Sequence, residues 1–188
     1  MPRPSAPPSA EWPTAVPLAT ERLRLEPLRV EHAREAFAVF KDVRLHTWTG
    51  GEPASLDELT ARYRRQAVGR SPDGTQGWLN WMLRRDADGL LVGTVQATLG
   101  RPRLHRPLRA HGLEAELAWM VGTAHQGRGY ARESALAMAR WLRTRGVLRL
   151  TAHIHPGHTA SEGVARSLGL SATAAVADGE TVWAAAGP

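Results

Sequence analysis

The chain has 188 residues and a formal net charge of +6, from 24 basic and 18 acidic side chains. A chain of this length fits one domain, and 43% hydrophobic residues suffice for a packed core, which excludes a largely disordered protein. The lack of cysteine excludes disulfide scaffolds, thiolate metal sites and cysteine nucleophiles. Because no run of 18 apolar residues and no secretion-signal pattern occurs, we expect a cytoplasmic protein without a membrane partner.

The first 17 residues contain six of the thirteen prolines. Because proline neither continues a helix nor donates to a sheet, this stretch is predicted to be a flexible arm with Trp12 as its one anchor. The domain itself is predicted to span residues 18–188.

Alternation of polar and apolar residues predicts strands, and apolar residues at helical spacing predict helices. The predicted strands cover residues 22–28, 78–84, 90–99, 113–121, 147–154, 171–177 and 180–185. The predicted helices cover residues 31–41, 55–68, 130–143 and 159–168. Ser55 and Glu58 have the spacing of a capping box at the start of the second helix. This order favours an α/β (α+β) fold with a mixed sheet over an alternating doubly wound fold.

An arginine-rich stretch, residues 100–112, has no acidic residue. The basic excess of the chain raises nucleic acids, membrane surfaces and phosphate-bearing ligands as partners. No nucleic-acid-binding motif accompanies it, so we do not expect a nucleic-acid partner. The stretch is interpreted either as a solvated loop or as a cover over a substrate site.

The segment after the strand at 113–121 is a glycine-bearing loop that opens a helix. Backbone amides at a helix N-terminus have no intrahelical acceptor, and Gly127 and Gly129 allow a ligand to approach the backbone, as in a phosphate-binding loop. Arg128 and Arg132 could add contacts to a phosphate. No Walker loop is present, and Arg132 stands where a dinucleotide-binding loop would have its third glycine. A plain glycine turn is the remaining alternative.

At this point the sequence resembles a known family. Residues Gln126–Ala131 match the Gln/Arg-x-x-Gly-x-Gly/Ala signature of the GNAT acyltransferase superfamily, whose loop binds the pyrophosphate of acetyl-CoA. Residues 20–25, 115–121, 155–161 and 167–170 are similar to the branch that acetylates ribosomal-protein N-termini. The resemblance covers about residues 20–186.

The resemblance implies a mostly antiparallel central sheet with helices on both faces. Strands 113–121 and 147–155 would be parallel and would splay apart at their C-terminal ends, and the pantetheine arm of acetyl-CoA would lie in the gap. A backbone amide near Met120 or Val121 would polarise the thioester carbonyl. The residues implied to bind the co-substrate are Trp119, Met120, Val121, Gln126, Gly127, Arg128, Gly129, Tyr130, Ala131, Arg132 and Ser161.

Two residues are candidates for catalysis. Glu116 stands where the family often has a glutamate that orients a water, so it could act as the base that deprotonates the amine; an ion pair with an arginine is the structural alternative. His158 stands where the family usually has asparagine, and could contact the co-substrate or act as a base near neutral pH. Ala165 occupies the place of a tyrosine that serves many relatives as general acid, so His158, Ser161 or water could replace it.

The histidines near residue 155 and the tryptophans are considered as a metal site and as an acceptor pocket, respectively. His153, His155 and His158 have ligand-like spacing, but no fourth ligand is evident, so we expect no metal. Four tryptophans could either line an acceptor pocket or belong to the core. They are Trp48, Trp78, Trp81 and Trp119; Trp141 and Trp183 are expected in the core.

The sequence therefore predicts an N-acetyltransferase that moves an acetyl group from acetyl-CoA to a primary amine by direct attack. The acceptor is either a small molecule or a protein N-terminus, and a homodimer is left open. The alternative is a non-catalytic acyl-CoA-binding or sensing module, favoured by the replaced tyrosine and asparagine.

Overall fold

A computed structural model describes residues 12–48, 50–101 and 112–185. In these residues one sheet runs in the order β1-β2-β3-β4-β5-β6-β8-β7. Its strands are β1 (Leu18–Ala19), β2 (Leu23–Pro27), β3 (Gly77–Arg85), β4 (Leu91–Gly100), β5 (Leu113–Val121), β6 (Val147–Ile154), β7 (Leu170–Ala177) and β8 (Glu180–Ala185). The β5–β6 pair is parallel and the other pairs are antiparallel, which confirms the predicted mixed, mostly antiparallel sheet.

The predicted helices are present, with ends within a few residues of the prediction. They are α1 (Ala33–Phe40), α2 (Leu56–Gln66), α3 (Tyr130–Thr144) and α4 (Thr159–Ser167). The capping box at the start of α2 is confirmed, because Ser55 and Glu58 each accept a hydrogen bond from the other's backbone amide. Three short 3-10 turns, at residues 30–32, 43–46 and 123–125, were not predicted.

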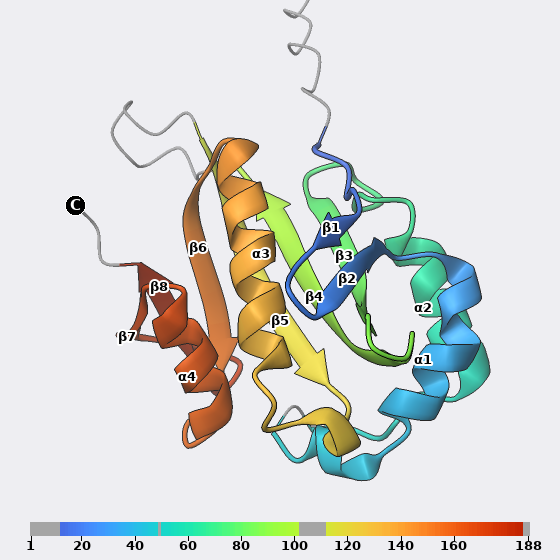
Figure 1. Cartoon of the computed structure of the whole chain (residues 1–188). Coiled ribbons are helices and arrows are strands. Elements are labelled where there is room, and N and C mark those ends of the chain that lie inside the picture. Colours follow the sequence, from blue (N-terminus) through green and yellow to red (C-terminus); the bar gives the residue numbers. More distant parts are fainter. Residues whose placement is uncertain (1–11, 49, 102–111, 186–188) are drawn as a thin grey trace, which may run out of the picture.

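The helices cover both faces of the sheet, as predicted. Successive side chains of a strand point to opposite faces, and in β3 Trp81 belongs to the larger core with α3 and α4, whereas Met82 belongs to the smaller core with α1 and α2. Figure 1 shows α3 and α4 in front of the sheet and α1 and α2 beside β2 and β3. Trp141 packs against the larger core and Trp183 is buried in it, as predicted.

The parallel strands β5 and β6 separate along their length. They are paired from Leu113 with Val147 to Glu116 with Thr151, and the pairing ends there. β4 continues to pair with β5 as far as Val121, and β8 continues to pair with β6 as far as Ile154. Each strand is therefore held from its outer side only, and a gap opens between their C-terminal ends, as the resemblance implied.

The last residues of the predicted arm contact the sheet. The Trp12 indole donates a hydrogen bond to the Gly74 carbonyl at 3.1 Å and packs against the larger core. The Trp81 indole donates to the Val16 carbonyl at 2.7 Å. The domain boundary at residue 18 stays a prediction, and residues 1–11 lie outside the described residues.

The packing of Trp12 against Gly77 can be tested with two glycines, Gly77 and Gly100, at the ends of the paired strands β3 and β4. A Cβ at Gly77 would lie 2.9 Å from Trp12 side-chain atoms, whereas a Cβ at Gly100 would have no neighbour within 4 Å. We expect Gly77→Ala to cost about 1–3 kcal/mol by overpacking, which lowers Tm by about 3 °C or more. Gly100→Ala should leave Tm unchanged or raise it, because alanine loses less backbone entropy on folding. Equal melting curves of the two variants, followed by circular dichroism, would contradict this packing of Trp12.

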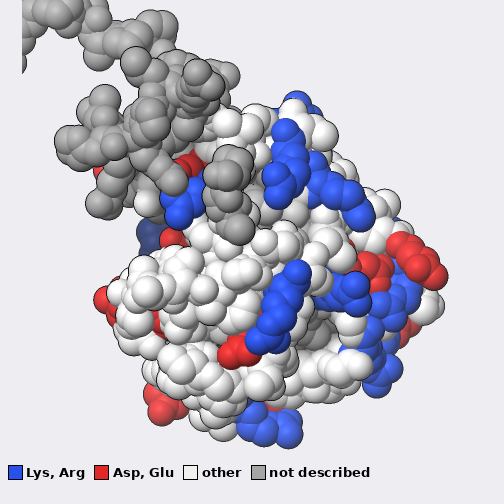
Figure 2. Space-filling view, turned by 90° about the vertical axis from the view of Figure 1, so that its left-hand side faces the viewer, with Lys and Arg blue, Asp and Glu red and all other residues white. Residues whose placement is uncertain are grey.

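Charged side chains are unevenly distributed. Figure 2 shows the molecule from the side of β7 and β8, where large areas carry neither acidic nor basic side chains. Most of the arginine-rich stretch, residues 102–111, lies outside the described residues, so its predicted role stays a prediction. In the described ranges, no helix has the length and apolar character needed to cross a membrane.

Candidate active site

A cavity of about 620 Å³ lies at the gap between β5 and β6. Its walls come from β5, the loop that leads to α3, the end of β6, the start of α4 and the turn at residues 43–46. All predicted site residues except Arg128 line this cavity. These are Glu116, Trp119, Met120, Val121, Gln126, Gly127, Gly129, Tyr130, Ala131, Arg132, His158 and Ser161.

The loop before α3 leaves backbone amides free at the edge of the cavity. Gly127 and Gly129 have φ of +73° and +81°, a left-handed conformation that glycine adopts without strain. Gly129 is the N-cap of α3 and supplies no side-chain acceptor. From Gly127 to Arg132, the amides donate no hydrogen bond to any described residue. The arrangement fits an anionic group such as a diphosphate.

Gln126 has a structural contact in this loop. Its side-chain Nε2 donates a 3.0 Å hydrogen bond to the Val121 carbonyl, and its backbone amide donates to the Thr123 carbonyl. Gln126 therefore ties the loop to the end of β5 and orients the amides that follow it.

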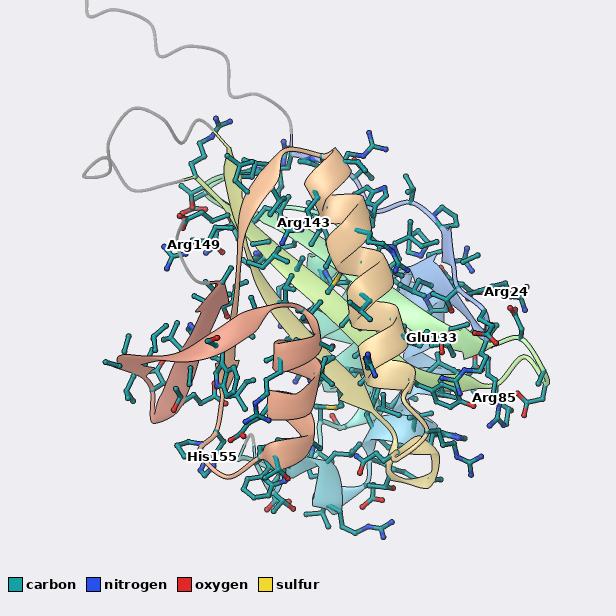
Figure 3. The ribbon with its side chains drawn as sticks, turned by 60° about the vertical axis from the view of Figure 1, so that its left-hand side comes forward. Arg24, Arg85, Glu133, Arg143, Arg149 and His155 are labelled. Carbon is teal, nitrogen blue, oxygen red and sulfur yellow. The ribbon has the colours of Figure 1, made fainter. Side chains whose placement is uncertain are left out.

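Basic side chains surround the start of α3. The Arg22 guanidinium lies 4.9 Å from the centre of the Tyr130 ring and pairs with Glu133 at 2.6 Å. Burial opposes ionisation of Glu133, but hydrogen bonds from Thr20 and Arg22 outweigh it and hold the pKa of this carboxyl below its usual value. Figure 3 shows Arg85 and Glu133 near the N-terminal end of α3, with Arg143 at the opposite end.

Glu116, on β5, lines the cavity. Its side chain is 53% exposed, and Oε2 lies 4.0 Å from Nε2 of His153 on β6. The arginine ion pair that was the structural alternative is formed by Glu114 instead, with Arg149 at 3.7 Å. Glu116 is therefore accessible to solvent and to a substrate, as a group that moves a proton must be.

His158 is the N-cap of α4, and its Nδ1 accepts a 3.5 Å hydrogen bond from the backbone amide of Ser161. The Trp48 ring stacks on the His158 ring, with centroids 4.9 Å apart and an interplanar angle of 24°. Burial lowers the pKa of His158, and the charge of His155 lowers it further. Ala165 is fully buried, so no side chain reaches the cavity from the position of the absent tyrosine.

The tryptophans divide between the cavity and the core. Trp48 and Trp119 line the cavity, and the Trp119 indole donates a 3.2 Å hydrogen bond to Ser161 Oγ. Trp81 is fully buried, and Trp78 lies outside the cavity lining. The Trp119–Ser161 hydrogen bond connects β5 to α4 across the gap that the strands leave open.

The turn at residues 43–46 contributes cavity residues that sequence reasoning missed, Arg44 and Leu45. Asp42 caps this turn and pairs with Arg44, and the Thr123 hydroxyl donates to Asp42 at 2.5 Å. These hydrogen bonds hold the pKa of Asp42 well below its usual range. The Asp-x-Arg spacing predicts only a local turn, so its contact with the loop after β5 could not be read from the sequence.

His125 is a further cavity residue that the sequence did not single out. Its Nδ1 is buried and has no hydrogen-bond partner in the described part of the chain. Burial lowers the pKa of this imidazole, and Arg85 and Arg128 lower it further. In the described part of the chain, no three His, Asp or Glu side chains form a group that could hold a metal ion.

Comparisons with known proteins agree with this geometry. The model of the acetyltransferase (GNAT) domain family matches residues 22–171. No curated protein sequence matches the chain significantly. The crystal structure of the acetyltransferase from Agrobacterium tumefaciens is similar at a TM-score of 0.67 with 26% identity, over 95% of this chain and 99% of that chain.

Two more distant structures show the likeness of fold alone. RimL, the ribosomal L7/L12 α-N-protein acetyltransferase solved with coenzyme A, is 14% identical at a TM-score of 0.67, over 88% of this chain and 94% of its own. AAC(6')-Ib, solved with paromomycin and acetyl-CoA, is 12% identical at a TM-score of 0.68, over 87% and 92%. Because the family model covers most of the chain, the predicted family is confirmed: the chain belongs to the GNAT acetyltransferases, a family of acetyl-CoA-dependent acyltransferases.

Proposed function

We propose that this protein transfers the acetyl group of acetyl-CoA to a primary amine, in the cytoplasm. One observation carries the proposal: a single cavity joins the free amides at the start of α3, the unpaired edge of β5 and the exposed carboxylate of Glu116. The first feature suits a diphosphate, the second an extended amide-containing arm, and the third the removal of a proton.

The amides from Gly127 to Arg132 would hold the diphosphate of acetyl-CoA. These amides lie at the positive end of the α3 dipole, and this end and the nearby Arg132 favour a negative charge. The pantetheine arm would follow β5 between Trp119 and Val121, where β6 has moved away and the strand edge is free. Acetyl-CoA supplies the activated acetyl group, and the protein supplies binding and orientation.

Glu116 would accept a proton from the acceptor ammonium, directly or through one water. The neutral nitrogen then attacks the thioester carbonyl carbon, the carbon–sulfur bond breaks with its electron pair on sulfur, and the nitrogen releases its second proton to water to give the amide. A backbone amide near Met120 or Val121 would stabilise the carbonyl oxygen as its charge grows.

The chemical class of the acceptor amine is inferred from the relatives and from the cavity lining. One of the two distant relatives is named as an acetyltransferase of the ribosomal protein L7/L12, and the other was solved in complex with paromomycin, so a protein and a small molecule both stay candidate acceptors. The cavity lining includes the carboxylates of Glu116 and Glu180 and the Trp48 ring, which suit an amine that arrives as an ammonium ion.

Release of free thiol from acetyl-CoA tests the proposal. The panel contains peptides with free N-termini, the same peptides with blocked N-termini, and small polyamines and aminoglycosides. We expect thiol release with at least one free amine and none with its blocked form. Tight acetyl-CoA binding by calorimetry without release for any amine would instead support the sensing module.

Trp48 provides a test of the acceptor end. Its ring stacks on His158 and lies 5.4 Å from the His155 ring. Loss of such an aromatic contact costs about 0.5–1.5 kcal/mol, so we expect Trp48→Ala to raise the acceptor KM by about 3- to 10-fold. Trp48→Phe, which keeps an aromatic ring, should have a smaller effect, and neither variant should change the dissociation constant of acetyl-CoA. An unchanged acceptor KM in Trp48→Ala would place the acceptor elsewhere.

A further inference from the structure

His158 is held by the fold in a way that decides which of its ring nitrogens can donate. It is the N-cap of α4, and its Nδ1 accepts the hydrogen bond from the backbone amide of Ser161. A neutral imidazole carries one proton, on either Nδ1 or Nε2. Because Nδ1 is the acceptor in this contact, the proton of the neutral ring is on Nε2.

The surroundings of the ring also oppose a second proton. The imidazole stands at the positive N-terminal end of α4, a helix of 9 residues, where a positive charge is disfavoured. Trp48 covers one face of the ring, and His155 lies on the same side of the cavity. Glu162, in the first turn of α4, and Glu180, in the cavity wall, are the acidic groups nearby. The pKa of His158 is lowered, because burial and His155 outweigh the two opposing influences, the contact of the ring with its own backbone and the charge of Glu162.

We propose that His158 acts as a neutral hydrogen-bond donor, through Nε2–H, to the sulfur that leaves during acetyl transfer, and not as a base. This proposal rests on the proposed function. It provides the leaving sulfur with a hydrogen-bond donor, which Ala165, fully buried and without a polar group, cannot supply. Ser161 is then a positioning residue, because its backbone amide fixes the tautomer.

The protons and electrons of the step balance without a charged histidine. The ammonium loses one proton to Glu116 or its water, and the nitrogen lone pair forms the new bond to carbon. The carbon–sulfur bond breaks and sulfur takes the electron pair, while Nε2–H of His158 donates to the growing negative charge and keeps its proton. The nitrogen loses its second proton to water, and water protonates the thiolate.

The tautomer is measured on the full-length chain without any turnover. Nitrogen-15 NMR of the histidine rings distinguishes protonated from unprotonated ring nitrogens, and the signals of His158 are identified by their absence in His158→Gln. Because the pKa of His158 is lowered from its ordinary value, we expect Nε2 protonated and Nδ1 unprotonated between about pH 7 and pH 8, with and without acetyl-CoA. A proton on Nδ1, or a doubly protonated ring in this range, would overturn the proposal.

Turnover is compared between two uncharged variants of similar length. His158→Gln keeps an N–H group near the place of Nε2, whereas His158→Met keeps none, and both lack the imidazole acceptor of the helix cap. A hydrogen bond to a charged group is worth about 1.5–3 kcal/mol, so we expect Gln to turn over about 10- to 100-fold faster than Met. Equal turnover rates of the two variants would overturn the proposal. It would also be overturned if the pH–rate profile of the wild type falls at acidic pH and this fall disappears in His158→Gln.

The two levels of the proposal fail separately. If no amine is acetylated, the proposed function is wrong, yet the nitrogen spectrum still decides the tautomer. If acetylation occurs and the Gln and Met variants are equally slow, the function stands and the role assigned to His158 is wrong.

Discussion

Gly129→Asp is expected to weaken acetyl-CoA binding by about 100-fold or more in calorimetry. The substitution puts a carboxylate at the N-cap of α3, beside the amides that would hold the diphosphate. Two like charges about 4 Å apart repel by about 4 kcal/mol at an effective dielectric constant of 20, and each 1.4 kcal/mol is tenfold in affinity. Arg22 Nη2 would lie 3.5 Å from the new Cβ, but this guanidinium is already paired with Glu133.

Gly129→Asn is the matched control, because asparagine has the same shape without the charge and tolerates the left-handed conformation better than most residues. We expect it to lose far less affinity than the aspartate variant. Gly146→Asp adds the same charge at a glycine with the same φ of +81°, at the far end of α3, and should leave binding unchanged. If the two Gly129 variants bind alike, strain and not charge is responsible, and the diphosphate is not held there.

Glu116→Gln is expected to lower kcat by about 100-fold or more, while the affinity for acetyl-CoA changes by less than about twofold. General-base catalysis by a positioned side chain contributes about 10²- to 10⁴-fold, and glutamine keeps the shape of glutamate without its basicity. The loss of turnover is measured by thiol release, and the unchanged affinity for acetyl-CoA is measured by calorimetry on the same preparation.

Glu114→Gln is the control, because Glu114 lies two residues earlier on the same face of β5 and contacts Arg149 outside the cavity lining. We expect it to keep kcat. Equal activity of the wild type and Glu116→Gln at every pH tested would remove the proposed base, and the exposed His153–Glu116 pair would then be a surface contact only.

Much of the fold was predictable because the local signals were strong. The capping box at Ser55 and the alternation in β4 are local patterns, and the corresponding elements formed where they were expected. β1 was missed because a pair of residues is too short to show alternation; its two residues are held by pairing with β2. The contact of Trp12 with Gly74 joins residues 62 positions apart, and no local pattern predicts such a distance.

The candidate site was predictable to the extent that it lies in one continuous segment. Residues 116–132 contribute just over half of the cavity lining, and the family signature marks residues 126–131 within them. Arg44 and Leu45 were missed because they enter the cavity from a turn that Asp42 and Thr123 join to the loop after β5. His125 was missed because a histidine in a loop gives no sign that the fold will bury it.

The sequence by itself determined the family, through its resemblance to the GNAT signature at Gln126–Ala131. It also determined the mixed sheet and the loop whose amides open α3, since these follow from neighbouring residues and backbone preferences. Only the tertiary structure decided that Glu114 contacts Arg149, that Glu116 lies beside His153, and that Nδ1 of His158 is an acceptor. The physical reason is that ion pairs and tautomers depend on which groups meet within a few ångströms. That distance is set by strand register and helix packing, to which residues far apart in the chain contribute together.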